Sequence, residues 1–208
     1  MKEIEIKKTN ELVEYESSLK FMQSRVKGIQ NNSQNELLWF LSHNHIYTQG
    51  TSSKNTEIIN LNQIKIIRSN RGGKTTYHGP GQRIIYFLIN LNKRNKDIRK
   101  FITKIETSII KSLKELNINS NSDRKNIGIW YKSNKNIYKI GAIGIRVKKW
   151  IAYHGFSINI NNDLNQYKKI IPCGIENKGV TNLVKIKNQD YKKLNFILEK
   201  NLINSLKN

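Results

Sequence analysis

Residues 137–160 read IYKIGAIGIRVKKWIAYHGFSINI and hold two strand-like runs, Ile137–Val147 and Trp150–Ile160, with no helix between them. A third run, Ile127–Tyr131, comes just before them along the chain. Strands that follow one another without a helix after each favour an α+β fold over a doubly wound parallel sheet, in which strands and helices alternate. We therefore expect an α+β protein with a mixed, mainly antiparallel sheet flanked by helices.

Amphipathic helices are expected outside this group of strands. Apolar residues recur at three- and four-residue spacing from Leu12 to Val26 and again from Ile98 to Leu116. Residues 191–206 read as a closing helix. Thr9 or Asn10 would cap the first helix.

Further strands are expected at shorter apolar runs, namely Leu37–Leu41, Ile64–Arg68 and Arg83–Leu91, with a weak strand signal at Ile4 and Ile6. The polar residues 117–126 read as a surface loop. The chain shows no internal repeat and no long linker. We therefore expect residues 1–208 to form a single domain.

The composition is strongly basic, because 37 Lys and Arg against 15 Asp and Glu give the 208 residues a formal net charge of +22. This charge would suit a nucleic-acid partner. However, 29 of the cations are Lys, and the chain has 29 Asn but two Ala and two Pro. Lys, Asn and Ile have AT-only codons, so a biased genome would raise the charge without selection for a polyanion. Since the Lys residues are scattered, we expect no nucleic-acid partner.

The chain has one cysteine, which excludes an intramolecular disulfide and a cysteine-based zinc cluster and fits a reducing cytoplasm. The longest apolar run, Ile84–Ile89, is too short to cross a bilayer. The first residues, MKEIEIKKTN, alternate Ile with charges and lack the apolar core of a signal peptide. We therefore expect a cytoplasmic protein with no membrane partner.

Residues 71–82, RGGKTTYHGPGQ, hold four of the twelve glycines of the chain. Paired glycines let a ligand or a second backbone come close, and their N–H groups can face a carbonyl or a phosphate. Residues 75–77 read as a short strand and residues 78–81 as a sharp turn. The stretch has neither the GxxxxGK[ST] spacing of a P-loop nor a GxGxxG pattern. Plain turn chemistry is the alternative to a binding site.

Residues 139–147, KIGAIGIRV, place a lysine in an apolar strand-like run. Strict alternation would put Lys139 on one apolar face with residues 141, 143, 145 and 147. A lysine there either extends to water at an edge or is a cation held in a cleft. The glycines at 141, 144 and 155 weaken a strand unless something passes close to the backbone. A narrow binding tunnel would explain them, and so would β-bulges.

The segment Ile171-Pro-Cys-Gly174 contains the cysteine. A lone cysteine is commonly an inert, buried side chain. Between proline and glycine, however, Cys173 is expected in a turn, where a thiol is more exposed and reactive. A nearby ammonium would lower the pKa of the thiol and raise the thiolate fraction. His78 and His154, each before a glycine, are either competing bases or structural residues.

Together these segments resemble the lipoyl(octanoyl) transferase family, the protein octanoyltransferases of lipoate biosynthesis. The resemblance rests on RGGKTTYHGPGQ at 71–82, KIGAIGIRV at 139–147 with HGF at 154–156, and PCG at 172–174 followed by VTNL at 180–183. A weaker similarity to the family is HNHIYTQG at 43–50, although Ser42 stands where the family usually has an acidic residue. Lys74 and Thr75 also depart from the Gln and Val that the family often has.

The resemblance implies a biotin/lipoate protein ligase-like fold and an acyl-transfer reaction. It implies that Cys173 takes the octanoyl group from octanoyl-acyl carrier protein as a thioester, while Lys139 lowers the pKa of the thiol or relays protons. A lysine of a lipoyl domain, in 2-oxoacid dehydrogenases or the glycine cleavage H protein, then attacks to give an amide. We expect a monomer. The implied substrate-binding residues are Arg71, Gly72, Gly73, Lys74, Thr75, Thr76, Tyr77, His78, Ala142, Ile143, Gly144, Gly155, Phe156 and Ser157.

This chemistry is expected to need no cofactor and no metal. Exchange between two thioesters is near balance, and conversion of a thioester to an amide is downhill. An enzyme thioester divides the transfer into two easier steps and lets two carrier proteins use one site in turn. An apolar tunnel would suit the acyl chain, because each buried methylene is worth about 0.8 kcal/mol.

Two alternatives have to be separated from this expectation. The first shares the fold and is an ATP-dependent lipoate or biotin protein ligase, which needs an adenylate site and no acyl-cysteine. The second is a basic RNA-binding module, motivated by the net charge alone. It predicts steeply salt-dependent RNA binding, but the sequence has no RRM, KH or comparable aromatic motif.

Overall fold

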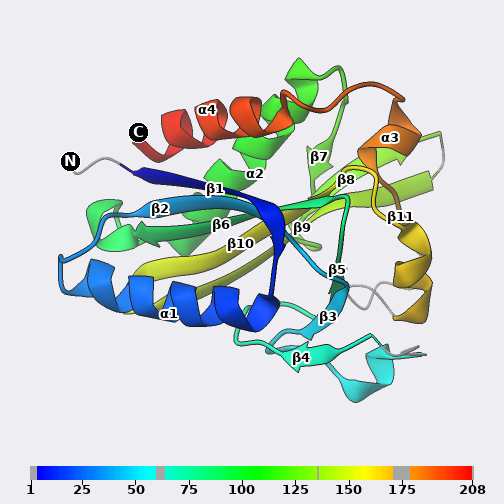
Figure 1. Ribbon diagram of the computed structural model, residues 1–208. Helices are drawn as coiled ribbons and strands as arrows, with labels where there is room; N and C mark the ends of the chain where they lie inside the picture. The colour runs from blue at the N-terminus through cyan, green and yellow to red at the C-terminus, as the bar shows by residue number, and fades with distance from the viewer. Residues whose placement is uncertain (1–3, 60–63, 135, 171–178, 208) are drawn as a thin grey trace.

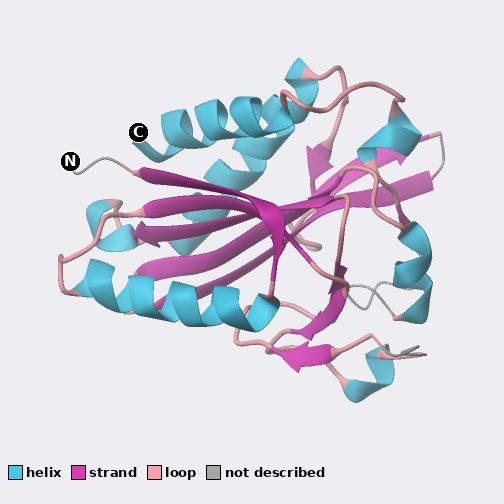
Figure 2. Cartoon of the chain, in the orientation of Figure 1, coloured by secondary structure: helices cyan, strands magenta, loops and turns pink. Residues whose placement is uncertain are grey.

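The computed structural model describes residues 4–59, 64–134, 136–170 and 179–207 (Figure 1). Within these residues an eight-stranded sheet forms the centre, and helices cover both of its faces (Figure 2). The strand order is β1-β2-β6-β10-β9-β8-β7, and β11 pairs with β9 outside this path. The bounds are β1 Glu5–Val13, β2 Leu37–His43, β6 Gln82–Asn90, β7 Asn121–Ser122, β8 Ile129–Ser133, β9 Asn136–Lys148, β10 Ile151–Asn159 and β11 Gly179–Val180.

The sheet is mixed and mainly antiparallel, as the sequence predicts. β2, β6, β10, β9, β8 and β7 are each antiparallel to the next, whereas β1 runs parallel to β2 and β11 parallel to β9. The three runs expected within residues 127–160 form β8, β9 and β10, which are direct neighbours.

A second, smaller sheet carries the glycine-rich loop. Its strand order is β4-β3-β5, with bounds β3 Ile46–Gln49, β4 Ile66–Arg68 and β5 Thr76–His78. The loop that joins β4 to β5 contains residues 69–75 and thus most of the RGGKTT stretch. Short 3₁₀ helices occupy Asn55–Glu57, Leu91–Lys93 and Leu164–Lys169.

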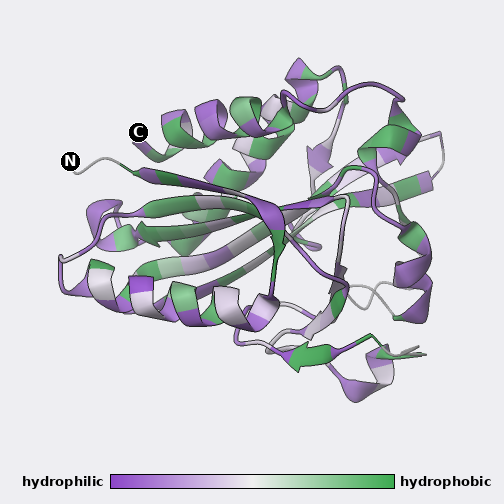
Figure 3. Cartoon of the chain, viewed as in Figure 1, coloured by the Kyte–Doolittle hydropathy of each residue, from purple (hydrophilic) through white to green (hydrophobic). Residues whose placement is uncertain are grey.

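Helix α1, Tyr15–Gln30, covers one face of the large sheet, and α2, Ile98–Glu115, with α4, Leu194–Lys207, covers the other (Figure 1). A short helix, α3, spans Leu183–Ile186. β6 shows why the sheet is buried on both sides, because its successive side chains point to opposite faces. Ile84, Tyr86 and Leu88 pack in the α1-side core, while Ile85, Phe87 and Ile89 pack in the α2/α4-side core. Apolar residues accordingly gather on the strands and on the inner sides of the helices (Figure 3).

The expected start of the first helix is wrong by several residues. α1 begins at Tyr15 after Glu14, and residues 9 and 10 belong to β1 instead of capping the helix. The hydroxyl of Thr9 accepts a hydrogen bond from the indole N–H of Trp39 at 2.9 Å. Pairing of β1 with the buried strand β2 therefore outweighs the capping preference of Thr9.

No helix in the described ranges is both long enough and apolar enough to cross a membrane.

Candidate functional site

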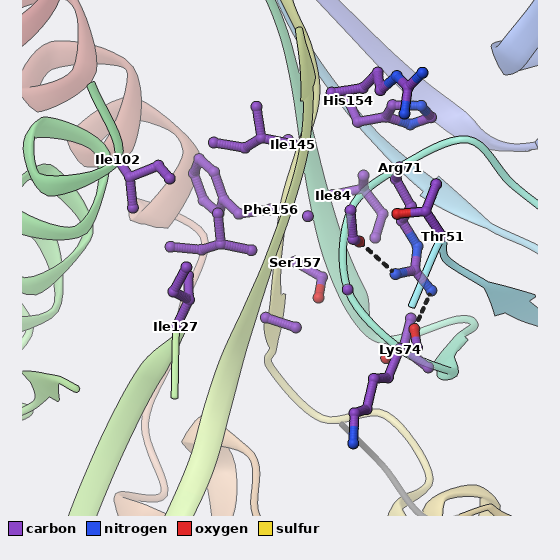
Figure 4. Close-up of a pocket in the computed structure, with 18 of the residues that line it drawn as sticks. Thr51, Arg71, Lys74, Ile84, Ile102, Ile127, Ile145, His154, Phe156 and Ser157 are labelled. Carbon is purple, nitrogen blue, oxygen red and sulfur yellow. Dashed lines mark hydrogen bonds between the residues drawn. The ribbon is translucent and has the colours of Figure 1, made fainter. Parts of the chain in front are cut away.

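A cavity of about 710 Å³ lies at the edge of β9 (Figure 4). β8 pairs with β9 only as far as Gly141, so among the described strands residues 142–148 have β10 alone as a partner. The glycine-rich loop closes this edge through a hydrogen bond from the N–H of Gly72 to the carbonyl of Ile145, 3.1 Å. The volume is in the usual range of small-ligand sites.

One wall of the cavity faces α1 and is fixed by cross-strand pairing. Ser157 lies opposite Ala142 on β9 and Ile84 on β6, and Gly155 lies opposite Gly144 and Tyr86 in the same way. Directly opposed residues share a face of the sheet. We call these six residues the α1-side wall: Ile84, Tyr86, Ala142, Gly144, Gly155 and Ser157.

The opposite face of the same strands lines the rest of the cavity. Phe156 and Ile143 are cross-strand partners on this face. In Figure 4, Ile102, Ile127, Ile145 and Phe156 lie on one side of the strand, and Thr51, Arg71 and Lys74 lie on the other. The α2-side wall comprises Ile98, Ile102, Ile127, Ile143, Ile145, Val147 and Phe156.

A β-bulge changes the face on which Lys139 lies. Trp130 pairs with Lys139, but the preceding residue, Ile129, pairs with Gly141, so β9 carries one extra residue at this point. The alternation argument assumed an unbroken strand and placed Lys139 with Ile143, which is wrong.

The side chain of Lys139 instead joins the α1-side wall. It lines the main cavity and, beside it, a small hollow that it shares with Thr76, Ala142 and Ser157. Lys139 is 8% exposed, and its ammonium nitrogen lies 4.9 Å from the centre of the Trp130 ring. Of the two alternatives left open by the sequence, the structure supports a cation held in a cleft.

Arg71 holds the glycine-rich loop in shape. Its guanidinium donates hydrogen bonds to the carbonyl of Thr48 at 2.6 Å, to the carbonyl of Lys74 at 2.8 Å and to the carbonyl of Gly72 at 3.0 Å (Figure 4 draws the last two). It also donates to the hydroxyl of Thr48 at 2.8 Å. Arg71 therefore lines the cavity and at the same time fixes three carbonyls around it.

The strand glycines allow close backbone packing. A Cβ on Gly155 would lie 1.9 Å from the carbonyl oxygen of Ile85 on β6, and a Cβ on Gly144 would lie 3.2 Å from the carbonyl oxygen of Gly72. A Cβ on Gly141 would lie 3.0 Å from the carbonyl oxygen of Ser157. The neighbours that need the space are thus strands and the glycine-rich loop.

Two of the expected binding residues lie behind the cavity and do not line it. The backbone N–H of Thr75 donates to the carboxylate of Glu57 at 2.9 Å. The hydroxyl of Tyr77 is joined to Nδ1 of His45 by a hydrogen bond of 2.7 Å. Both side chains are fully buried and support the loop from its far side.

A buried cluster of tyrosine and histidine side chains closes the α1 end of the site and comprises Tyr15, His43, His78, Tyr86 and His154. The sequence motifs contained its three histidines but did not indicate the two tyrosines. His43 donates from Nδ1 to the carbonyl of Val13 at 2.6 Å, so its Nε2 accepts from the hydroxyl of Tyr86 at 2.7 Å. Burial lowers the pKa of His43 to about 4. Tyr15 stacks on His78, and both line the cavity. The imidazole of His43 is therefore neutral near pH 7.

His78 has a defined tautomer. Gln82 donates from its amide to Asn159 at 2.8 Å and to Tyr167 at 2.8 Å, which leaves its oxygen to accept from Nδ1 of His78 at 2.7 Å. Burial is the main reason why the pKa of His78 is lowered to about 3. Its Nε2 is thus a hydrogen-bond acceptor.

His154 has an unusual backbone, with φ of +65° inside β10. Its Nε2 bonds to the side-chain oxygen of Asn70 at 2.6 Å, and burial, followed by the charges of Arg71 and Arg146, lowers its pKa to about 3. It belongs to the same neutral, buried group as His43 and His78.

The structure therefore brings most of the expected site residues together. Those that line the cavity are Arg71, Gly72, Gly73, Lys74, Thr76, His78, Lys139, Ala142, Ile143, Gly144, Gly155, Phe156 and Ser157. Cys173 lies outside the described residues. Lining residues that lie outside the quoted motifs include Tyr15, Thr51, Ile84, Tyr86, Ile102 and Lys125, and Arg146 lies within the 139–147 motif but was not among the expected site residues. Ile84 and Tyr86 lie opposite Ser157 and Gly155 in the pairing of β6 with β10, so knowledge of this strand pairing would have indicated them.

Comparisons with known proteins agree with one another. Residues 14–198 match the family described as the lipoyl protein ligase A/B catalytic domain. Curated relatives include octanoyltransferases of Ehrlichia ruminantium, 45% identical over 172 residues (82% of this chain, 83% of the relative), and of Wolbachia pipientis wMel, 45% identical over 176 residues (84% and 85%). An octanoyltransferase of Anaplasma marginale is 40% identical over 181 residues (86% and 85%).

Solved structures confirm the expected biotin/lipoate protein ligase-like fold. The structure of lipoate-protein ligase A bound with ATP has a TM-score of 0.79 at 16% identity, covering 99% of this chain and 86% of the other. P. falciparum LipL1 in complex with lipoate has a TM-score of 0.75 at 19% identity, covering 99% and 63%. At such identities the likeness concerns the fold alone.

Proposed function

The chain belongs to the lipoyl protein ligase A/B catalytic-domain family and is an octanoyltransferase of that family, and on this premise we propose that octanoyl-acyl carrier protein is its donor and a lysine of a lipoyl domain is its acceptor. Its activity as an acyltransferase serves lipoate biosynthesis. We infer that Cys173 holds the octanoyl group between the two carrier proteins and that Lys139 assists this cysteine.

The position of Lys139 is the observation that carries the proposal. A buried ammonium beside a ligand-sized cavity favours an anion next to it. The thiolate of a cysteine is such an anion, and it is also the reactive form of the thiol. The hydroxyls of Thr76 and Ser157 line the small hollow next to Lys139 and are available to hold a polar acyl carbonyl.

In the first step, the Cys173 thiolate attacks the thioester carbon of the donor. The new carbon–sulfur bond forms, the bond to the carrier sulfur breaks, and the leaving thiolate takes a proton from the Lys139 ammonium. In the second step, the amine of the target lysine attacks the acyl-enzyme, an amide bond forms, and the Cys173 sulfur leaves. The neutral Lys139 accepts the proton that the attacking nitrogen loses, which restores the starting state.

The acyl chain is proposed to lie along the α1-side wall. Lys139 belongs to this side, so the thioester carbon must lie there as well. From Ala142 and Ser157 the wall continues to Ile84 and Tyr86, which are apolar side chains suited to methylene groups. The substrate contacts proposed for the glycine-rich loop then surround the acyl carbonyl.

The net charge of +22 supports acidic protein substrates. Acyl carrier proteins and many lipoyl domains are acidic, and opposite charge accelerates the encounter of two proteins. The proposed acceptors are the lipoyl domains of 2-oxoacid dehydrogenases and the glycine cleavage H protein. A monomer is proposed, and light scattering of the purified chain tests it.

Mass spectrometry of the acyl-enzyme tests the reaction. After incubation with octanoyl-acyl carrier protein and no acceptor, we expect an octanoyl mass increment on the peptide that contains Cys173. Cys173→Ala is expected to abolish transfer, and Lys139→Ala to slow it severely. Lys148→Ala, an exposed lysine on the same strand, is the matched control and should be unaffected.

Two outcomes would contradict the proposal. Near-normal transfer by Cys173→Ala would exclude the acyl-cysteine. Lipoyl-domain modification from free octanoate and ATP, without any mass increment on Cys173, would identify an ATP-dependent ligase instead.

A further inference from the structure

Two residues, Gly128 just before β8 and Trp130 within β8, enclose the Lys139 side chain. Trp130 is the cross-strand partner of Lys139, and the ammonium nitrogen lies 4.9 Å from the centre of the indole ring. Gly128 has φ of +142°, and a Cβ there would lie 2.5 Å from Cε of Lys139 and 3.1 Å from its Nζ. The lysine therefore runs between an aromatic ring and a backbone that has to lack a side chain.

The ring is itself held in one orientation. The indole N–H of Trp130 donates to the carbonyl of Asn126 at 2.8 Å, and the side-chain amide of Asn126 donates to the carboxylate of Asp123 at 2.8 Å. Trp130 is 4% exposed. Attraction between an ammonium and an aromatic face is stronger when water is excluded from the pair.

The choice of an aromatic partner has a chemical consequence. A ring face attracts an ammonium without neutralising it and without accepting its proton. The ring contact by itself therefore leaves the positive charge of an ammonium unneutralised. Among the described residues, the carboxylates near this segment are Glu106 of α2, which accepts from the backbone N–H of Gly128, and Asp123, which is bonded to Asn126. The nearby cations are Lys125, which also lines the cavity, and Arg71 and Lys74 across the cavity.

We propose that Trp130 is a positioning residue of the acyl transfer: its ring holds the charged Lys139 side chain at the α1-side wall, and Gly128 provides the space through which that side chain passes. This inference rests on the proposed role of Lys139. It assigns to residues 126–130 the role of holding the Lys139 side chain in place.

The first measurement reports the contact itself. In protein labelled with ¹³C-lysine, the ε-methylene resonance of Lys139, assigned with Lys139→Ala, is expected to be shifted upfield by the ring current of Trp130. The shift should disappear in Trp130→Leu and largely persist in Trp130→Phe, which keeps an aromatic face.

The second measurement reports the effect on the thiol. Since the chain has a single cysteine, its alkylation by iodoacetamide as a function of pH follows Cys173 alone. In Trp130→Leu we expect alkylation at pH 7 to slow about tenfold, with the pH profile moved upward by about one unit. Trp130→Phe should retain most of the wild-type rate, and Lys139→Ala should show at least the shift of Trp130→Leu.

A matched control exists on the surface. The exposed Trp150 stands 5.9 Å from the ammonium of Lys96, so Trp150→Leu removes a comparable ring and should leave the thiol profile unchanged. Circular dichroism and melting curves establish that each variant is folded. If Trp130→Leu does not fold, Gly128→Ala replaces it and is expected to displace Lys139 and move the pH profile of alkylation upward. Trp130→Phe remains the variant that is expected to stay close to the wild type.

The outcomes separate the inference from the proposed function. A shifted profile in Lys139→Ala with a wild-type profile in Trp130→Leu would overturn the inference and leave the Cys173–Lys139 pair intact. An unchanged profile in Lys139→Ala would overturn that pair and the inference together. A Lys139 resonance that does not depend on Trp130 would refute the ring contact, whatever the thiol does.

Discussion

The backbone N–H of Gly72 donates a hydrogen bond to the carbonyl oxygen of Ile145 across 3.1 Å, and this bond fastens the glycine-rich loop to β9. A Cβ on Gly72 would lie 2.9 Å from the same oxygen, and a Cβ on Gly144 would lie 3.2 Å from the carbonyl oxygen of Gly72. Two backbones meet here without room for a side chain. Glycine at positions 72 and 144 therefore allows the loop to lie directly against β9.

Gly144→Val should separate the loop from β9. The added side chain would push against the Gly72 carbonyl and the Arg71 side chain, and a shift of about 1 Å in a positioning element can cost about 100-fold in rate. We expect kcat/KM for octanoyl transfer to fall about 10- to 100-fold. The control is Gly28→Ala in α1, where the three atoms nearest to the new methyl all belong to the flexible side chain of Gln34. Wild-type transfer by Gly144→Val would show that the loop does not need this contact.

Arg71→Lys should destabilise the glycine-rich loop although it keeps the positive charge at this position. A lysine presents one compact ammonium and cannot reach the carbonyls of Thr48, Gly72 and Lys74 together, as the planar guanidinium does. Loss of such buried hydrogen bonds should lower the free energy of unfolding by about 1–3 kcal/mol in urea titrations.

Arg68→Lys is the matched control, because Arg68 is exposed and bonds to the side chain of Asn55 at 3.2 Å. Surface changes of this kind stay within about 0.5 kcal/mol. Equal effects of the two substitutions would mean that Arg71 is not a structural clamp.

The sequence predicted the elements whose pattern is local. Three- and four-residue spacing located α1 and α2, and residues 191–206 were also expected to form a helix, which is α4. The uninterrupted strand runs of residues 127–160 indicated the antiparallel neighbours β8, β9 and β10. The continuous apolar run in β6 follows from burial on both faces of the sheet. Each of these signals arises from residues close together in the chain.

The sequence could not predict features that depend on a partner strand. The face of Lys139 is set by a bulge against β8, which no period of two reveals. Thr9 looks like a helix cap but lies in β1, which pairs with β2, and its hydroxyl accepts from the indole N–H of Trp39 on that strand. Likewise, Thr75 and Tyr77 sit in the middle of the binding motif and yet face away from the cavity, since Glu57 and His45 hold them on the far side.

Ala142→Leu should shorten the acyl chain that the enzyme accepts. Ala142 lies on the α1-side wall between Lys139 and the apolar residues Ile84 and Tyr86, so a larger side chain would fill part of the path proposed for the acyl group. We expect hexanoyl transfer to be favoured over octanoyl transfer about tenfold relative to wild type, because each methylene that is no longer buried costs about 0.8 kcal/mol.

Val147→Leu provides the comparison on the α2-side wall. Competition assays with hexanoyl- and octanoyl-acyl carrier protein measure both variants. A change of chain-length preference in Val147→Leu and none in Ala142→Leu would place the acyl chain on the opposite face of β9.

Acid should destabilise the protein well above the pH at which carboxylates titrate. Burial lowers the pKa of His43 to about 4 and the pKa values of His78 and His154 to about 3, whereas unfolded histidine titrates near 6.5. Above pH 6.5 all three are neutral in both states, and their contribution to stability is complete. Between pH 6.5 and about 4 the unfolded chain binds protons that the folded chain does not, so stability falls as pH falls.

Each of these histidines should contribute a slope of up to about 1.4 kcal/mol per pH unit, so three together give about 4 kcal/mol per unit below pH 6. Urea titrations between pH 7.5 and 5 measure this slope, and His43→Gln should reduce it by about one third. Imidazole Cε1–H resonances of the folded protein provide the direct check, because those of His43, His78 and His154 should not move over this range. Titration of any of the three near pH 6 in the folded state would contradict their assignment as buried, neutral groups.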